Sequence, residues 1–162
     1  MEKKNQNFVI FEENEIPNRE LKISRLLNAP IELVWKVWTD PDHIKNWWGP
    51  NGFTNTIHKM DFKVEGEWNL TMHGPDGTNF PNRSIFKEII THKKIVFEHF
   101  NPHFIATLLF ESKGERTLIN WSSLFDTSEM RETLIKAHKA DEGMKQNVEK
   151  LEKYLQQQLK LN

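Results

Sequence analysis

The chain has 162 residues, a length that favours one compact domain able to bury roughly 70% of its unfolded surface. Its 22 Lys and Arg against 23 Asp and Glu give a net charge of −1, which excludes the basic surface typical of nucleic-acid binding or of a polybasic membrane anchor. The absence of cysteine excludes disulfides and thiolate metal sites. No apolar run is long enough for a secretory signal or a membrane span, so we expect a soluble, cytoplasmic protein.

The composition divides the chain into an extension and a domain. Residues 1–18 are polar except for four apolar residues at 8–11, and we interpret them as an N-terminal extension. No internal repeat, low-complexity tract or linker interrupts the remainder. Residues 19–162 are therefore predicted to form a single domain.

The first part of this domain shows one strand followed by two short helices. Residues 21–26 alternate apolar and polar side chains, which predicts a strand. Pro30 opens one helix, and Pro41 opens another that ends near residue 47. From residue 53 the period changes to two, which predicts six strands of an antiparallel meander joined by short turns. The expected strands are 53–62, 66–73, 79–90, 94–100, 103–111 and 116–125.

The last part of the chain predicts a long helix. Asp126 to Glu129 form a capping-box-like start, and apolar residues then recur at helical spacing to the end. Gly143 costs about 1 kcal/mol relative to alanine inside a helix, so a break near residue 140 is possible. Only this helix is long enough to cover the concave face of the sheet. The order of elements predicts an α+β helix-grip fold: a seven-stranded curved antiparallel sheet with two short helices and a long C-terminal helix over an internal cavity.

A set of short motifs, spread from about residue 20 to residue 158, carries a family resemblance. They are Asn28-Ala29-Pro30, Trp38-Thr39-Asp40-Pro41, Trp47-Trp48-Gly49-Pro50, Glu65-Gly66-Glu67-Trp68, the segment 72–77 and the segment 149–155. In this order they resemble the START-like superfamily of the birch-pollen-allergen fold (SRPBCC), and more narrowly its branch named for homologues of the activator of the heat-shock-protein-90 ATPase. The resemblance implies binding of a small apolar or amphipathic molecule between the sheet and the long helix.

Two positions depart from the pattern of that family. Glu65-Gly66 stands where many relatives have Gly-Gly, and Gly143-Met144 stands where many have Gly-Trp. The second change alters the volume of a helix residue expected to face the cavity, so a relative's ligand does not transfer to this chain.

The side-chain parity of the strands indicates which residues face the helix. Eleven Phe and six Trp against one Tyr predict an interior rich in rings without hydroxyl groups, whether as a filled core or as the lining of a cavity. The adjacent tryptophans at the helix end have two interpretations. In the functional one, an indole walls or gates the mouth of a cavity; in the structural one, one ring is buried and the other is half-exposed at the seam. The residues predicted to bind the ligand are Trp48, Trp68, Leu70, Met72, Phe86, Phe97, His99, Trp121, Met144 and Val148.

Three histidines are the residues that could suggest metal or acid–base chemistry. His73, His99 and His103 are expected at the same end of the sheet, with His99 and His103 facing each other across a short turn. His73 lies two strands away, about 10 Å at the usual strand spacing, which disfavours a shared zinc ion. Nothing in the sequence places two carboxylates on one face. We therefore expect hydrogen-bonded rim histidines, no metal and no cofactor.

The leading hypothesis is a non-catalytic binder of a hydrophobic or aromatic small molecule, with a stress- or lipid-related role. A cyclase- or hydrolase-type enzyme is the alternative, with His73 or His99 as general base. A co-chaperone-like interaction domain, with a chaperone as partner, is a third hypothesis that rests on family analogy alone. The sequence leaves open whether the protein is a monomer or a homodimer.

Overall fold

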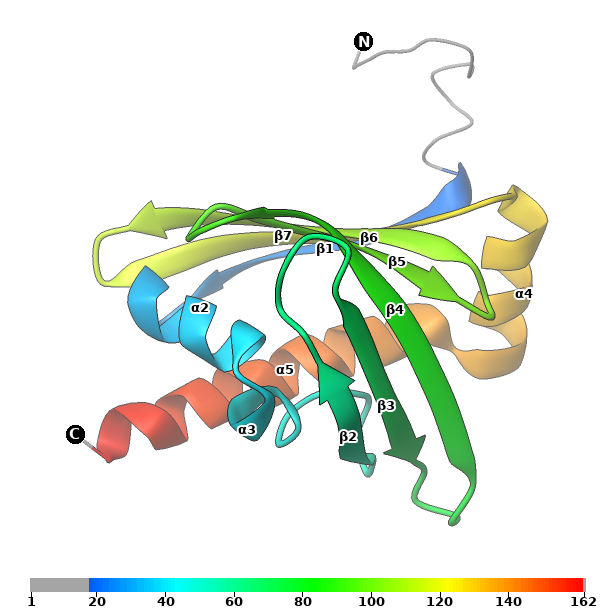
Figure 1. The fold of residues 1–162 in the computed structure, drawn as a ribbon, viewed down its shortest axis with the longest axis horizontal. Helices are drawn as coiled ribbons and strands as arrows, with labels where there is room; N and C mark the ends of the chain where they lie inside the picture. The colour runs from blue at the N-terminus through cyan, green and yellow to red at the C-terminus, as the bar shows by residue number, and fades with distance from the viewer. Residues whose placement is uncertain (1–17, 162) are drawn as a thin grey trace, which may run out of the picture.

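The computed structural model describes residues 18–161, which form a curved antiparallel sheet with a long helix beneath it (Figure 1). The sheet has seven strands in the order β1-β7-β6-β5-β4-β3-β2, so the first strand of the chain pairs with the last. The strands are β1 (Glu20–Leu27), β2 (Thr54–Met60), β3 (Glu67–His73), β4 (Asn79–Ile90), β5 (Lys94–Phe100), β6 (Phe104–Lys113) and β7 (Arg116–Phe125). The helices are α2 (Ile31–Thr39), α3 (Pro41–Ile44), α4 (Ser128–His138) and α5 (Ala140–Lys160). The predicted α+β helix-grip fold is confirmed, and residues 1–17 of the predicted extension lie outside the described residues.

The long C-terminal helix is divided in two, as the sequence allowed. Lys139 adopts a left-handed conformation with φ of 51°, and it separates α4 from α5. Gly143 does not cause this break, because it lies inside α5, where a Cβ atom would approach the Pro50 ring to 3.4 Å. Thr127, rather than Asp126, caps α4, since its Oγ1 accepts a hydrogen bond from the Met130 N–H at 3.1 Å. Because Thr127 is the cap, the Asp126 carboxylate is available for another contact.

The second strand is shorter than expected because the chain turns sharply after it. A Cβ atom at residue 66 would lie 2.0 Å from the Asp61 carbonyl oxygen, so this turn requires Gly66. Glu65 beside it has φ of 68°, a conformation that costs a non-glycine residue roughly 1–2 kcal/mol. The family's Gly-Gly pair would avoid that strain. This chain instead gains an ion pair, with Glu65 Oε2 3.1 Å from Lys87 Nζ.

The filled part of the core lies between the sheet, α2, α3 and the second half of α5. Val148, Leu151 and Leu155 of α5 are fully buried there. Trp47 is also buried, and its indole N–H donates to the Val37 carbonyl at 3.1 Å. That carbonyl would normally accept from the residue four positions later, which is Pro41 and has no N–H. The indole thus satisfies a helix-end acceptor and fixes α2 against the following turn.

A buried hydrogen bond joins the start of β7 to the segment before α2, and it makes a testable contribution to stability. Thr117 is fully buried, and its Oγ1 donates to the Ala29 carbonyl at 2.8 Å. Thr117→Val keeps the shape but leaves the carbonyl unsatisfied, so we expect a loss of about 1–3 kcal/mol in the free energy of unfolding. Urea denaturation of this variant and of Thr107→Val, the same change on the outer face, measures it. Equal stability of the two variants would contradict the assignment.

Candidate ligand-binding cavity

A cavity of about 270 Å³ lies between the concave face of the sheet and the first half of α5. Met144 and Asn147 of α5 form its helix side, and α4 borders it at Leu134. Figure 1 shows α4 at the end of the sheet where the β5–β6 turn lies, opposite the end covered by α2. The concave face therefore has two parts: a filled core under α2 and a cavity toward α4.

The structure brings eight of the ten predicted ligand-binding residues to the wall of this cavity. They are Trp48, Trp68, Leu70, Met72, Phe97, His99, Trp121 and Met144. Phe86 does not reach the wall, because its ring stacks beneath Trp68 at 5.9 Å and contacts Phe62 at 5.0 Å. Val148 is one turn beyond Met144, where α5 already packs on the filled core. These two residues support the wall from behind.

Aromatic rings form the floor of the cavity. Trp48 stacks on Trp121 with centroids 5.5 Å apart and meets Trp68 edge-on at 5.0 Å. Phe97 contacts Trp68 edge-on at 5.3 Å. The indole N–H groups of Trp68 and Trp121 are buried and have no acceptor among the described residues. These rings therefore contribute apolar surface, and any polar anchor must come from other residues.

The two adjacent tryptophans have different roles, as their position at a helix end suggested. Trp47 is 1% exposed and belongs to the core, whereas Trp48 is half-buried and lines the cavity. The structural and the functional interpretation of the pair are thus each partly right, because Trp47 packs in the core and Trp48 forms part of the wall.

A small polar group lies on β4, β5 and β7 within this apolar wall. Ser84 pairs in register with His99, and Asn82 lies two residues from Ser84 on the same side of β4. Ser84 is 3% exposed and Ser123 is 6% exposed, and both line the cavity. Neither hydroxyl has a hydrogen-bond partner in the part of the chain that the structure describes. They are the unpaired polar groups that a ligand can reach.

His99 is a buried ring at the edge of this polar group. Burial lowers its pKa, while the hydrogen bond to Pro102 opposes that effect. Its Nδ1 lies 2.8 Å from the Pro102 carbonyl oxygen, and its Nε2 lies 2.6 Å from Asn82 Oδ1. A neutral ring carries one N–H and donates to only one of these oxygens at a time. The ring also stacks on Phe104 at 4.4 Å, which fixes its plane.

The other two histidines lie on the outer face of the sheet, away from the cavity. His73 bonds to Thr56 Oγ1 at 2.8 Å and to Asn79 Oδ1 at 2.7 Å. The expectation that His99 and His103 face each other is wrong, because His99 pairs with Phe104 and leaves His103 on the opposite face. The three rings do not converge. Across residues 18–161, no three His, Asp or Glu side chains are grouped to hold a metal ion.

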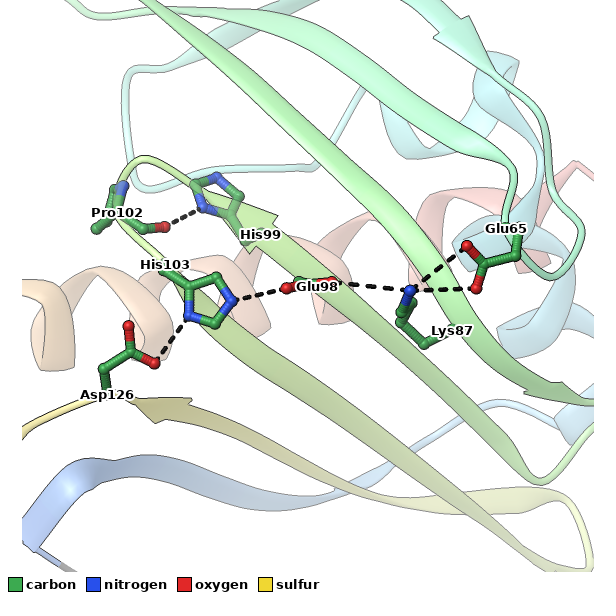
Figure 2. A network of polar contacts seen from close by, with 7 residues as sticks. All are labelled: Glu65, Lys87, Glu98, His99, Pro102, His103 and Asp126. Carbon is green, nitrogen blue, oxygen red and sulfur yellow. Dashed lines mark hydrogen bonds and ion pairs between the residues drawn. The ribbon is translucent and has the colours of Figure 1, made fainter.

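His103 is the centre of a charged network on the outer face (Figure 2). Its Nε2 lies 2.8 Å from Glu98 Oε2, and its Nδ1 lies 2.8 Å from Asp126 Oδ1. Glu98 continues the network through Lys87 to Glu65. No pattern in the sequence places two carboxylates together, whereas here Glu98 and Asp126 share one imidazole. A protonated ring carries an N–H on both nitrogens and can donate to both carboxylates at once, which a neutral ring cannot do.

The network predicts a pH-dependent contribution to stability. Hydrogen bonds to Glu98 and then Asp126 raise the pKa of His103. A raised pKa in the folded state stabilises the protein below the unfolded value of about 6.5, and this contribution is lost as the pH rises through the folded-state pKa. His103→Gln should therefore destabilise the protein most below about pH 6.5 and progressively less above it. Urea denaturation of both proteins at several pH values measures the difference, and a constant difference would contradict the network.

Some cavity residues were not predicted from the sequence. Asn82 shares the parity of Ser84 in the predicted strand and could have been found by that signal. Leu134, His138 and Lys139 line the cavity because the chain turns at Lys139. No residue pattern marks that turn, since a lysine in the left-handed conformation has no sequence signature.

The comparisons with known proteins identify the family of this fold. Residues 28–156 match the family model described as "Activator of Hsp90 ATPase homolog 1-like protein". The chain belongs to this family. The AHSA1-like proteins are members of the SRPBCC/START-like superfamily, so the resemblance carried by the short motifs is confirmed. None of the curated proteins matches the chain.

Solved structures of similar proteins share the AHSA1-like fold. A protein from Arthrobacter aurescens is 24% identical, with a TM-score of 0.82 and coverage of 93% of each chain. A protein from Nitrosomonas europaea is 24% identical, with a TM-score of 0.77 and coverage of 87% of this chain and 96% of that chain. The AHSA1 protein from Silicibacter pomeroyi is 17% identical, with a TM-score of 0.70 and coverage of 86% and 99%. Within residues 18–161, no helix is both long and apolar enough to cross a membrane.

Proposed function

We propose that this AHSA1-like domain binds one small, mainly apolar molecule in the cavity between the sheet and α5. The observation that carries the proposal is the composition of the wall. Rings of Trp48, Trp68 and Trp121 supply apolar surface, while the hydroxyls of Ser84 and Ser123 remain unpaired beside them. Few polar groups in an apolar concave wall are typical of small-molecule sites.

The size of the cavity limits the ligand. Its 270 Å³ lies just below the range of about 300–1,000 Å³ that holds drug-sized ligands. A ligand with about nine buried methylene groups would gain about 7 kcal/mol from leaving water, before the cost of immobilisation. Because the cost of immobilisation is subtracted from that gain, the dissociation constant should be no tighter than about 10 µM. We therefore expect moderate affinity and tolerance of different apolar skeletons.

The histidine positions support binding over catalysis. Of the two histidines considered as general base, His73 lies outside the cavity and only His99 lines it. Both nitrogens of His99 face oxygens of the protein, which supports a role in positioning the wall. The co-chaperone hypothesis rests on the family name, and no described surface of this chain adds to it. A small-molecule ligand is the hypothesis that uses the observed cavity.

A neutral fluorescent probe tests the proposed function. N-phenyl-1-naphthylamine is apolar and brightens when it leaves water, so its titration into the protein should give a saturable signal with one site per chain. We expect a dissociation constant of about 10 µM or weaker. The same titration in urea, where the cavity is lost, is the control. A signal that never saturates, or that persists after unfolding, would contradict the proposal.

A further inference from the structure

The charged side chains that line the cavity are of one sign. No Asp or Glu side chain lies among the residues that line it, and its titratable lining residues are His99, His138 and Lys139. Of these, His138 and Lys139 are exposed to solvent and, with Pro102, mark the mouth. Lys139 forms no ion pair within residues 18–161. The wall at this end therefore carries a free ammonium group and no carboxylate.

The N-terminus of α5 lies at the same end of the cavity. Lys139 is its N-cap and makes no side-chain capping bond, and Ala140 and Gly143 of its first turn line the cavity. The Gly143 N–H donates to the Lys139 carbonyl, so the N–H groups before it are left without a partner inside the helix. A 21-residue helix carries about half a positive charge at this end, which favours an anion. Asp141 and Glu142 also lie in this turn, but they are exposed and outside the cavity wall.

A buried hydroxyl provides an independent sign of a polar ligand group. Ser84 is only 3% exposed and lines the cavity. It has no hydrogen-bond partner among the described residues. It pairs in register with His99, whose Nδ1 contacts Pro102 at the mouth. Because Ser84 lines the cavity and no protein group pairs with it, its hydroxyl is free to donate to an oxygen of the ligand. Ser84 thus places a hydrogen-bond donor on the sheet side, near the positive end of the cavity.

We propose that the cavity selects an acidic amphiphile, an apolar chain or ring system that carries one carboxylate. This inference rests on the proposed function and specifies the class of ligand. The apolar part lies on the floor formed by Trp68 and Trp121, and the carboxylate lies between Lys139, the first turn of α5 and the Ser84 hydroxyl. A cationic ligand would meet Lys139 and the helix N-terminus with the same sign of charge. An uncharged ligand would leave both without a partner.

A matched pair of probes separates this inference from the proposed function. Decanoate and decan-1-ol have the same chain length and differ in the head group, and each can be titrated against bound N-phenyl-1-naphthylamine at pH 7.5. A purely apolar cavity binds the alcohol far more tightly, because burial of an ionised carboxylate without partners is costly. We expect decanoate to bind at least as tightly as the alcohol.

Variants of the mouth complete the test. Lys139→Gln should weaken decanoate about fivefold and leave decan-1-ol within about twofold, the effect expected of one exposed charge near a helix N-terminus. Lys145→Gln removes the same charge from an exposed part of α5 outside the wall. It should change the affinity for neither decanoate nor decan-1-ol. Tighter binding of the alcohol, with no effect of Lys139→Gln, would overturn the acidic class and leave the proposed function standing. If neither decanoate nor decan-1-ol displaces the naphthylamine, the acidic class is overturned. If the naphthylamine itself does not bind, the proposed function is overturned as well.

Discussion

Met144→Trp should abolish ligand binding while the fold persists. Met144 lines the cavity from α5, and its larger replacement places an indole in a space of about 270 Å³. We expect the affinity for N-phenyl-1-naphthylamine to fall at least about tenfold, equivalent to about 1.4 kcal/mol. Overpacking a filled core typically costs about 1–3 kcal/mol. The free energy of unfolding should change by less than this, because the ring fills a void. Probe titration and urea denaturation measure the two effects.

The matched control for this variant is Lys145→Trp, which adds the same side chain to the next residue of α5. Lys145 is exposed and does not line the cavity, so affinity should remain at the wild-type value. Loss of binding in both variants would attribute the effect to the added tryptophan rather than to its position. Unchanged binding in Met144→Trp would mean that the probe binds elsewhere on the protein.

Trp47→Ala should cost about 3–5 kcal/mol of stability, the usual penalty for removing a buried tryptophan. Trp47 is 1% exposed, and its indole N–H satisfies the Val37 carbonyl that Pro41 leaves without a donor. A loss of this size is a large fraction of the 5–15 kcal/mol that stabilises a typical domain. Urea denaturation measures it. Trp47→Phe keeps a ring but removes the N–H, and it should cost about 1–3 kcal/mol.

The neighbouring residue is the matched comparison. Trp48→Ala removes a half-buried ring of the cavity wall, so we expect a smaller loss of about 1–3 kcal/mol together with altered probe affinity. Trp47→Ala should therefore mainly lower the free energy of unfolding, whereas Trp48→Ala should also change the affinity for the probe. Equal losses of stability, with no change in probe binding for Trp48→Ala, would contradict the division between core ring and wall ring.

Most of the fold could be predicted from the sequence because local periodicity determines it. Alternation in residues 53–125 defined the meander, and prolines 30 and 41 marked the starts of the two short helices. Boundaries differed where backbone conformation, rather than hydrophobic pattern, decides. The turn after β2 requires glycine at position 66, because the Asp61 carbonyl leaves no space for a Cβ atom.

Less of the candidate site could be predicted, because it depends on contacts between distant segments. Strand parity brought Trp68, Phe97 and Trp121 to one wall, but it could not show that Phe62 and Trp68 screen Phe86 from the cavity. The outer network was missed for a related reason. Asp126 meets His103 only because β7 pairs with β6 in one particular register, which local patterns do not specify.

The most direct test of ligand binding in this cavity is NMR of the protein labelled with ¹³C at its methionine methyl groups, with and without N-phenyl-1-naphthylamine. Met72 and Met144 line the cavity, whereas Met60 and Met130 do not and serve as internal controls. A ligand between the sheet and α5 should shift the Met72 and Met144 signals, because aromatic rings strongly affect the chemical shifts of nearby nuclei, and should leave the two controls in place. Shifts confined to Met60 or Met130, with Met72 and Met144 unchanged at saturation, would contradict the account.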